Sequence, residues 1–218
     1  MRAWARRWVG EAVRATNQWL THTAAIVPGT PSAARFGSFG DGTYVGFPQG
    51  PVTNASHIHI GADVLVAARV TLSVGMVEGQ EMLTDSVIRI GDGCLFAPGT
   101  AIVGHYGIDI GDHVYTGTNV YITDQNHAYD DTTVPIGRQA PRDERVRIGA
   151  GTWIGAGAVI LPGSEIGENV VVAANAVVRG MVPDRCVVAG VPARVVRQHD
   201  DENGWAAVNN GGAATPGG

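Results

Sequence analysis

The sequence predicts an all-β solenoid of the parallel β-helix type, and three features of residues 148–183 support this prediction. Branched aliphatic residues recur there every six positions without a break. Glycine or asparagine follows each of the first five after three positions, and a small or β-branched residue comes one position later. Neither an α-helix nor a single strand has a period of six, whereas stacked short strands do. The aliphatic series is Ile148, Ile154, Ile160, Ile166, Val172 and Val178.

Each six-residue repeat is expected to form one short strand and one corner. The aliphatic side chain points into a dry core, and the small residue four places later fills the remaining interior space. Glycine or asparagine at the corner tolerates the positive φ of a tight turn. Three such sides close one triangular coil, and stacked coils satisfy one another's backbone groups, as in other solenoids. The period alone does not give the handedness of the coil.

Residues 1–27 are predicted to form an amphipathic helix ahead of the solenoid. Trp4, Trp8 and Trp19 share one helical face, while the arginines lie largely elsewhere. We favour a helix that packs these tryptophans on the solenoid or on a neighbouring subunit. The alternative is a basic helix that lies on a membrane surface. With the connector that follows, this segment forms a first region, residues 1–35.

The six-residue frame begins at Ile60, within a β-helical region expected to cover residues 36–197. Two loops interrupt the frame, a polar one at residues 75–87 and a longer one at residues 123–147. Long structured interruptions of a regular scaffold are usually functional, so the longer loop is predicted to protrude and to carry the function. Whether the shorter loop contributes to the site stays open. Residues 198–218 lack periodicity and are expected to form a flexible tail without chemistry.

Composition limits the partners and the compartment. All 15 basic residues are arginine and the net charge is −5, so nothing favours nucleic acid as a partner. No apolar run approaches the ~20 residues of a membrane span, and the N-terminus lacks the apolar core of a secretion signal. We therefore expect a cytoplasmic protein, with peripheral membrane contact through the N-terminal helix as the alternative. Cys94 occupies an interior repeat position, which predicts a buried, reduced thiol.

Over residues 58–197 the sequence resembles the hexapeptide-repeat acyltransferases. Three segments carry the resemblance: IGAGTWIGAGAVILPGSEIGENVVVAANAVV, the closing VVAGVPARVVR, and the loop NHAYDD…VPIGRQ. The first two are similar to coenzyme-A-dependent maltose, galactoside and xenobiotic acetyltransferases, and the loop is similar to enzymes that acylate sugars during surface-polysaccharide assembly. The resemblance implies a left-handed parallel β-helix and a homotrimer with active sites between subunits. It also implies acetyl-CoA as a co-substrate, without a permanently bound cofactor or a metal.

His127, at the start of the long loop, matches the catalytic histidine of that family. Transfer of an acetyl group to a hydroxyl needs a base that removes the hydroxyl proton during attack on the thioester carbonyl. Imidazole, with an unperturbed pKa near ~6.5, suits that role. From the residues alone, the alternative is a loop histidine hydrogen-bonded to a neighbouring aspartate. Asp124 is the candidate to orient the imidazole ring or to raise its basicity, as carboxylates do in catalytic triads.

The resemblance also implies a binding surface for coenzyme A. Trp153 would border the pantetheine arm, and the backbone N–H of Ala156 would stabilise the oxyanion. Ala174, one coil later, would bond pantetheine through its backbone. Guanidinium groups suit the adenine and phosphate end because they offer charge and a fork of donors, although ordinary solvated arginines are the alternative. The arginine candidates are Arg179, Arg194 and Arg197.

The acceptor side departs from the pattern of the galactoside enzymes. Gly99 stands where that pattern has an acceptor-binding asparagine, and His105 with Tyr106 replaces a common acidic pair. These two residues and Gln139, in the long loop, are therefore the candidates for contacts with a different acceptor. Together these features predict an acetyl-CoA-dependent O-acetyltransferase that acts on a sugar or polysaccharide precursor. An amine acceptor is a close variant, because the same base and oxyanion site would serve.

Two other classes of protein remain open. A purely structural β-helix subunit would bind no coenzyme A and would not depend on His127. A zinc-dependent carbonic anhydrase of the γ class, built on the same helix, would need three histidines that converge between subunits. His105, His113 and His127 are available for this, but they lack that family's spacing.

Overall fold

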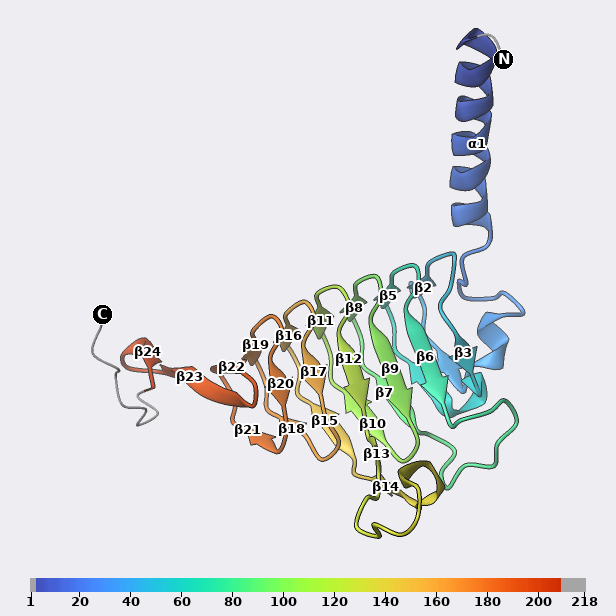
Figure 1. Cartoon of the computed structure of the whole chain (residues 1–218). Helices are drawn as coiled ribbons and strands as arrows, with labels where there is room; N and C mark the ends of the chain where they lie inside the picture. Colours follow the sequence, from blue (N-terminus) through green and yellow to red (C-terminus); the bar gives the residue numbers. More distant parts are fainter. Residues whose placement is uncertain (1–2, 209–218) are drawn as a thin grey trace.

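The computed structural model describes residues 3–208, with side chains from residue 6 onward. One helix, α1 (Ala3–Thr23), projects from one end of a tapering body of stacked strands, and the chain leaves that body at the other end (Figure 1). Three short 3₁₀ helices lie in the connections, at Ala33–Arg35, Ala55–His57 and Ile136–Arg138.

The strands of the body form three sheets, and neighbours within each sheet are parallel apart from the last two strands of the second sheet. The first contains β1 (Ser38–Phe39), β4 (Ile58–Ile60), β7 (Ile88–Ile90), β10 (Ile108–Ile110), β15 (Val146–Ile148), β18 (Glu165–Ile166) and β21 (Met181–Val182). The second contains β2 (Tyr44–Val45), β5 (Leu65–Val66), β8 (Leu95–Phe96), β11 (Tyr115–Thr116), β16 (Trp153–Ile154), β19 (Val171–Val172), β22 (Cys186–Gly190), β23 (Ala193–Asp200) and β24 (Gly204–Ala207). The third contains β3 (Val52–Thr53), β6 (Thr71–Val74), β9 (Ala101–Gly104), β12 (Tyr121–Thr123), β17 (Val159–Ile160) and β20 (Val177–Val178).

The chain visits the three sheets in turn, so each circuit adds one parallel strand to each sheet, as the six-residue repeat predicts for a parallel β-helix. The circuits leave three edges along the body. We call the edge where the chain passes from the second sheet to the third the 2–3 edge, and the edge where it passes from the third to the first the 3–1 edge. The two segments predicted to be loops, residues 75–87 and 123–147, lie at the 3–1 edge, after β6 and β12. The ends of the longer one belong to the body, since Thr123 closes β12 and Val146 opens β15.

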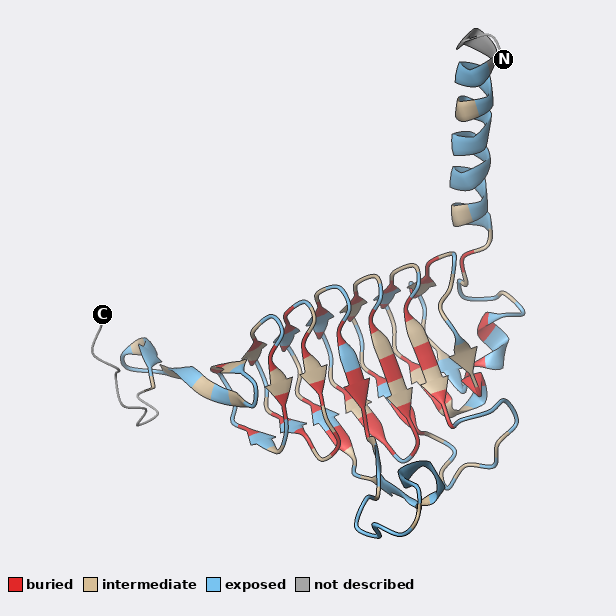
Figure 2. Ribbon diagram, viewed as in Figure 1, coloured by how far each residue is buried: buried red, intermediate tan, exposed pale blue. Residues whose placement is uncertain are grey.

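The core forms because successive side chains of a strand point to opposite faces, and buried residues recur along the strands of the body (Figure 2). In the first sheet Ile60, Ile90, Ile110 and Ile148 are register neighbours, and each is at most 4% exposed. Burying one such side chain contributes about 1.5–3 kcal/mol. A slip of one residue would turn this whole row of isoleucines toward the solvent, so their burial holds the strands in register.

The corners adopt the left-handed backbone conformation that the repeat predicts. Gly151 has φ +69° and Asn169, one coil later, has φ +52°. A Cβ atom added to Gly151 would lie 2.5 Å from the Asn169 side-chain oxygen, so the asparagine of one coil covers the glycine of the coil before it. The other predicted corner residues, Gly157, Gly163 and Asn175, also have positive φ.

Both cysteines are buried, with Cys94 1% and Cys186 0% exposed, and both are free thiols. Burial raises the pKa of the Cys94 thiol to about 11 and also raises the pKa of Cys186. Because the thiolate is the reactive form, we expect the native protein at pH 8 to resist a thiol reagent such as DTNB. The protein unfolded in guanidinium should react at both of its 2 cysteines. Rapid labelling of native protein would contradict the burial of these thiols.

Helix α1 does not pack along the body of its own chain, so the favoured prediction of packing on the solenoid is wrong for the single chain (Figure 1). Trp8 and Trp19 are 67% and 63% exposed. Contacts with the body are limited to the helix end, where the Tyr44 hydroxyl donates to the Thr21 carbonyl at 3.5 Å. Docking on a second subunit or on a membrane surface stays a prediction. Among the described residues, no helix has the length and apolarity needed to cross a membrane.

The C-terminal segment is more ordered than the sequence suggests. β23 runs antiparallel to β22 and continues to Asp200, and β24 pairs with β23. The rings of His199 and Trp205 contact edge to face, 5.4 Å apart. The prediction of a flexible tail is therefore wrong for residues 198–208, and residues 209–218 lie outside the described part of the chain.

Candidate active site

The long loop forms a two-stranded antiparallel ribbon that stands out from the 3–1 edge (Figure 1). Its strands are β13 (Gln125–His127) and β14 (Pro141–Asp143). Gln139 holds the tip of the loop, because its amide nitrogen donates to the carbonyls of Asp131 and Val134, both at 2.9 Å. This structural task differs from the acceptor contact predicted for Gln139.

His127 lies at the end of β13 with an exposed side chain. Its backbone N–H donates to the Asn126 side-chain oxygen at 2.9 Å. Within the described residues its imidazole ring has no hydrogen bond or ion pair, so the alternative of a histidine bonded to a neighbouring aspartate is not what the chain adopts. The ring is free to contact a bound molecule, as a general base must be.

Asp124 is not the partner of His127. Its carboxylate is 0% exposed and accepts the backbone N–H groups of His105, Tyr106 and Gly107, at 2.8, 2.8 and 2.5 Å. These three bonds close the turn of the preceding coil on the 3–1 edge. The predicted role of Asp124 in orienting the imidazole ring is therefore wrong for this chain, since the carboxylate is buried beneath that turn.

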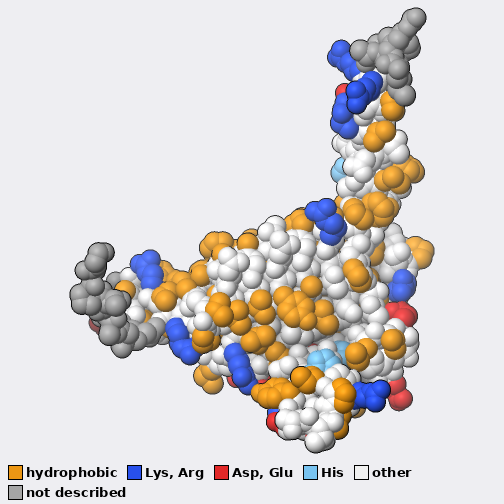
Figure 3. All heavy atoms as spheres, viewed as in Figure 1, with side chains coloured by type: hydrophobic (Ala, Val, Ile, Leu, Met, Phe, Trp, Pro, Cys, Tyr) orange, Lys and Arg blue, Asp and Glu red, His pale blue; other side chains and the backbone are white. Residues whose placement is uncertain are grey.

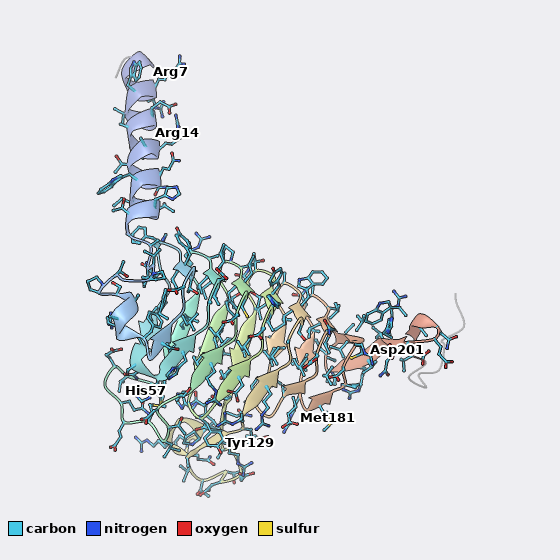
Figure 4. The ribbon with its side chains drawn as sticks, turned by 180° about the vertical axis from the view of Figure 1, so that it is seen from behind. Arg7, Arg14, His57, Tyr129, Met181 and Asp201 are labelled. Carbon is cyan, nitrogen blue, oxygen red and sulfur yellow. The ribbon has the colours of Figure 1, made fainter. Side chains whose placement is uncertain are left out.

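The turn held by Asp124 places two predicted acceptor residues beside the ribbon. His105 is 8% exposed, whereas Tyr106 is 39% exposed and lies under the Arg145 guanidinium, 5.4 Å from its ring centre. Histidine atoms reach the surface beside the protruding loop (Figure 3). His57, two coils before this turn, lies on the same side of the body as Tyr129 of the loop (Figure 4). The 3–1 edge therefore brings His105, Tyr106 and His127 into one region.

Asp143 is a polar residue in this region that sequence reasoning missed. It lies opposite Gln125 in the ribbon, and its Oδ1 atom is buried without a hydrogen-bond partner. Burial raises the pKa of the Asp143 carboxyl, the charge of Asp124 raises it further, and His105 acts in the opposite direction. Only the pairing of β14 with β13 brings Asp143 here, and the local sequence carries no signal of that pairing.

Of the residues predicted to bind coenzyme A, Ala156 and Ala174 lie on the 2–3 edge and Trp153 lies on the adjoining second sheet. Trp153 is 56% exposed on the second sheet, between Tyr115 and Val171 of the neighbouring coils. Ala156 and Ala174 are exposed corner residues of successive coils. Within the described residues neither alanine donates its backbone N–H, so both groups can bind an oxygen atom of a ligand.

The three predicted arginines are exposed but lie in two different places on the body. Arg194 and Arg197 lie on β23, beyond the last coil. Arg179 follows β20 on the 3–1 edge. There it borders a cavity of about 100 Å³ at the base of the ribbon. The cavity is lined by Gln125, Asn126, Glu144, Leu161, Pro162 and Arg179.

The residues of the predicted site are thus split between two edges of the body. His127 stands on the 3–1 edge, whereas Ala156 and Ala174 stand on the 2–3 edge, with the third sheet between them. Among the described residues of one chain, no group of three or more histidine, cysteine or acidic side chains could hold a metal ion. A zinc site from His105, His113 and His127 is therefore not formed within the single chain.

Two family models match the coils. The model described as "Bacterial transferase hexapeptide (six repeats)" matches residues 145–180, and the one described as "Hexapeptide repeat of succinyl-transferase" matches residues 87–124. Both segments lie in the stacked body, outside the protruding ribbon.

Similar proteins are named as acetyltransferases. The chain is 40% identical to one from Mycobacterium tuberculosis, over 50% of this chain and 37% of the relative. It is 35% identical to an Escherichia coli protein named for O-acetyl transfer in lipopolysaccharide biosynthesis, over 44% of this chain and 52% of the relative. A solved galactoside acetyltransferase in complex with coenzyme A superposes with a TM-score of 0.52 at 26% identity, over 66% of each chain.

The chain spans 37% and 52% of the length of the first two relatives, so these likenesses do not cover the whole of those proteins. The residues matched by the two family models coincide with the six-residue repeat and the parallel sheets. The chain therefore carries hexapeptide repeats of bacterial transferases over residues 87–124 and 145–180, and it is similar to proteins named as acetyltransferases.

Proposed function

We propose that the protein transfers an acetyl group from acetyl-CoA to a hydroxyl of a sugar or polysaccharide precursor, with His127 as the general base. The observation that carries the proposal is the free imidazole ring of His127 at the end of a strand of the protruding ribbon. The names of the relatives, which refer to galactoside and lipopolysaccharide O-acetyl transfer, support this class of acceptor.

The reaction needs one base and one oxyanion site. His127 accepts the proton of the acceptor hydroxyl as its oxygen attacks the thioester carbonyl. The negative charge that develops on the carbonyl oxygen is held by the backbone N–H of Ala156. When the carbon–sulfur bond breaks, the imidazolium returns the proton to the leaving thiolate, so that coenzyme A leaves as the thiol.

Coenzyme A is proposed to lie along the 2–3 edge as a co-substrate. The exposed Trp153 ring offers an apolar surface for the pantetheine arm. The free N–H of Ala174 can donate to a pantetheine amide oxygen. Arg194 and Arg197, exposed on β23, suit the phosphates at the far end.

The division of the site between two edges supports assembly of several copies of the chain. In a symmetric oligomer the 3–1 edge of one copy can face the 2–3 edge of the next. We propose a homotrimer of left-handed coils, in the cytoplasm, in which the acyl donor and His127 meet between subunits. Contact of helix α1 with a membrane surface belongs to the same proposal.

Thiol release from acetyl-CoA, followed with a panel of sugar acceptors, tests the proposed activity. We expect release that depends on the acceptor and saturates with acetyl-CoA. Absence of release with every acceptor, together with no detectable binding of coenzyme A in a calorimeter, would favour the structural-subunit alternative. Stoichiometric zinc in the purified protein would favour the carbonic-anhydrase alternative.

A further inference from the structure

The carboxylate of Asp143 has an unusual environment. Its Oδ1 atom is buried without a hydrogen-bond partner, one of two such side-chain atoms among the described residues. The other, in His199, lies 3.7 Å from the Asp201 carboxylate at the far end of the chain. Buried polar atoms in folded proteins are nearly always bonded, so an orphaned carboxylate oxygen at a candidate active site points to a hydrogen-bond donor from a bound molecule.

The register of the ribbon places this oxygen near the proposed base. Asp143 pairs with Gln125, and His127 pairs with Pro141, in antiparallel register. Side chains of directly opposed residues share a face of the ribbon, so Asp143 and His127 are diagonal neighbours on one face. Diagonal neighbours in such a pair are about 7–8 Å apart. Two hydrogen bonds of about 2.8 Å each would leave room for two hydroxyl oxygens of one molecule between them.

Asp143 also faces the turn of the preceding coil. The buried His105 lies within electrostatic reach of Asp143, and so does Asp124. Asp124 is saturated by three backbone N–H groups and cannot bind a ligand. His105 donates no hydrogen bond to the orphaned oxygen, so a hydroxyl group of a bound molecule can take that place.

We propose that Asp143 is an acceptor-binding residue. His127 deprotonates one hydroxyl of the acceptor molecule, and Asp143 accepts a hydrogen bond from a second hydroxyl of the same molecule. The acceptor is thus a polyol such as a sugar ring, with a free hydroxyl close to the one that is acetylated. The proposal rests on the O-acetyltransferase activity proposed above and names the acceptor chemistry that its site selects.

The experiment compares wild type with Asp143→Asn, which keeps the shape of the side chain but halves its acceptor oxygens. We expect the KM for the polyol acceptor to rise about 10- to 150-fold, the range that follows from loss of one hydrogen bond to a charged group. The KM for acetyl-CoA should not change. An acceptor that lacks the second hydroxyl should already be poor for wild type, and the variant should treat it no worse. Asp41→Asn, an equal change at an exposed aspartate outside the loop, is the matched control.

Stability provides a check that the variant folds. Because burial raises the pKa of Asp143, the ionised form is less favourable in the folded chain than in the unfolded one. Stability therefore falls as the pH rises from the ordinary aspartate pKa through the raised value. Asp143→Asn removes this cost, so its thermal midpoint at pH 7 should equal or exceed that of wild type.

Three outcomes would overturn the proposal while leaving the proposed function intact. The first is an unchanged KM for the polyol in Asp143→Asn. The second is an equal rise in the KM of the variant for the acceptor that lacks the second hydroxyl. The third is a strong preference of wild type for a simple amine over any polyol. If wild type releases no thiol with any acceptor, the proposed function fails and the Asp143 proposal fails with it.

Discussion

Replacing Asp124 by alanine is expected to lower the free energy of unfolding by about 3–5 kcal/mol, the cost of breaking a buried charged network. The carboxylate is fully buried and accepts three backbone N–H groups from the turn at residues 105–107. Removal leaves these donors unsatisfied beneath the turn. Urea unfolding followed by far-ultraviolet circular dichroism measures the change.

Two variants make the Asp124 result specific. Asp124→Asn keeps one acceptor oxygen, so it should fall between alanine and wild type in stability. Asp41→Ala removes an exposed carboxylate that has no hydrogen bond among the described residues, and it should change the free energy of unfolding by less than about 0.5 kcal/mol. If Asp124→Asn instead kept full stability and lost only kcat, Asp124 would act on His127 after all, and its assignment to the turn would be wrong.

Replacing His127 by alanine is expected to lower kcat about 10²- to 10⁴-fold, the usual contribution of a general base. The side chain is exposed and unbonded within the described residues, so the free energy of unfolding should not change. The KM for acetyl-CoA should also stay the same, because the proposed donor contacts lie on the other edge of the body. Initial rates of thiol release over a range of acceptor and acetyl-CoA concentrations separate these effects.

His22→Ala serves as the matched control for His127, because this histidine lies at the end of α1 in the described structure, away from both edges. It should keep the wild-type kcat. A His127→Ala protein that acetylates every accepted sugar at the wild-type rate would remove the base from the proposed mechanism. A variant that loses coenzyme A binding as well would indicate that His127 supports the donor site.

The six-residue repeat predicted the stacked body well because its physical basis is local. Ile148 and Ile154 point inward since alternate strand residues share a face. Gly151 and Asn169 form corners because they tolerate positive φ. Each repeat meets only its neighbours, so short-range pattern is sufficient to place these residues.

The site was harder to predict, because its contacts join residues far apart in the sequence. Asp124 stands three positions before His127, yet its carboxylate turns inward to the coil before. Asp143 reaches the same face as His127 only through the pairing of β13 with β14. The strand β24 depends on antiparallel pairing with β23, and the six-residue repeat does not predict such pairing.

Subunit complementation tests most directly the central claim that two edges from different chains form one site. His127→Ala disables the 3–1 edge, and Ala174→Glu places bulk and negative charge on the exposed coenzyme A path of the 2–3 edge. Each variant alone should be almost inactive. Co-expressed in equal amounts, they should regain about a quarter of the wild-type activity, because half the chains carry each intact edge and a site draws on two chains. No recovery in mixed oligomers would contradict the claim, since it would mean that both edges of a site come from one chain.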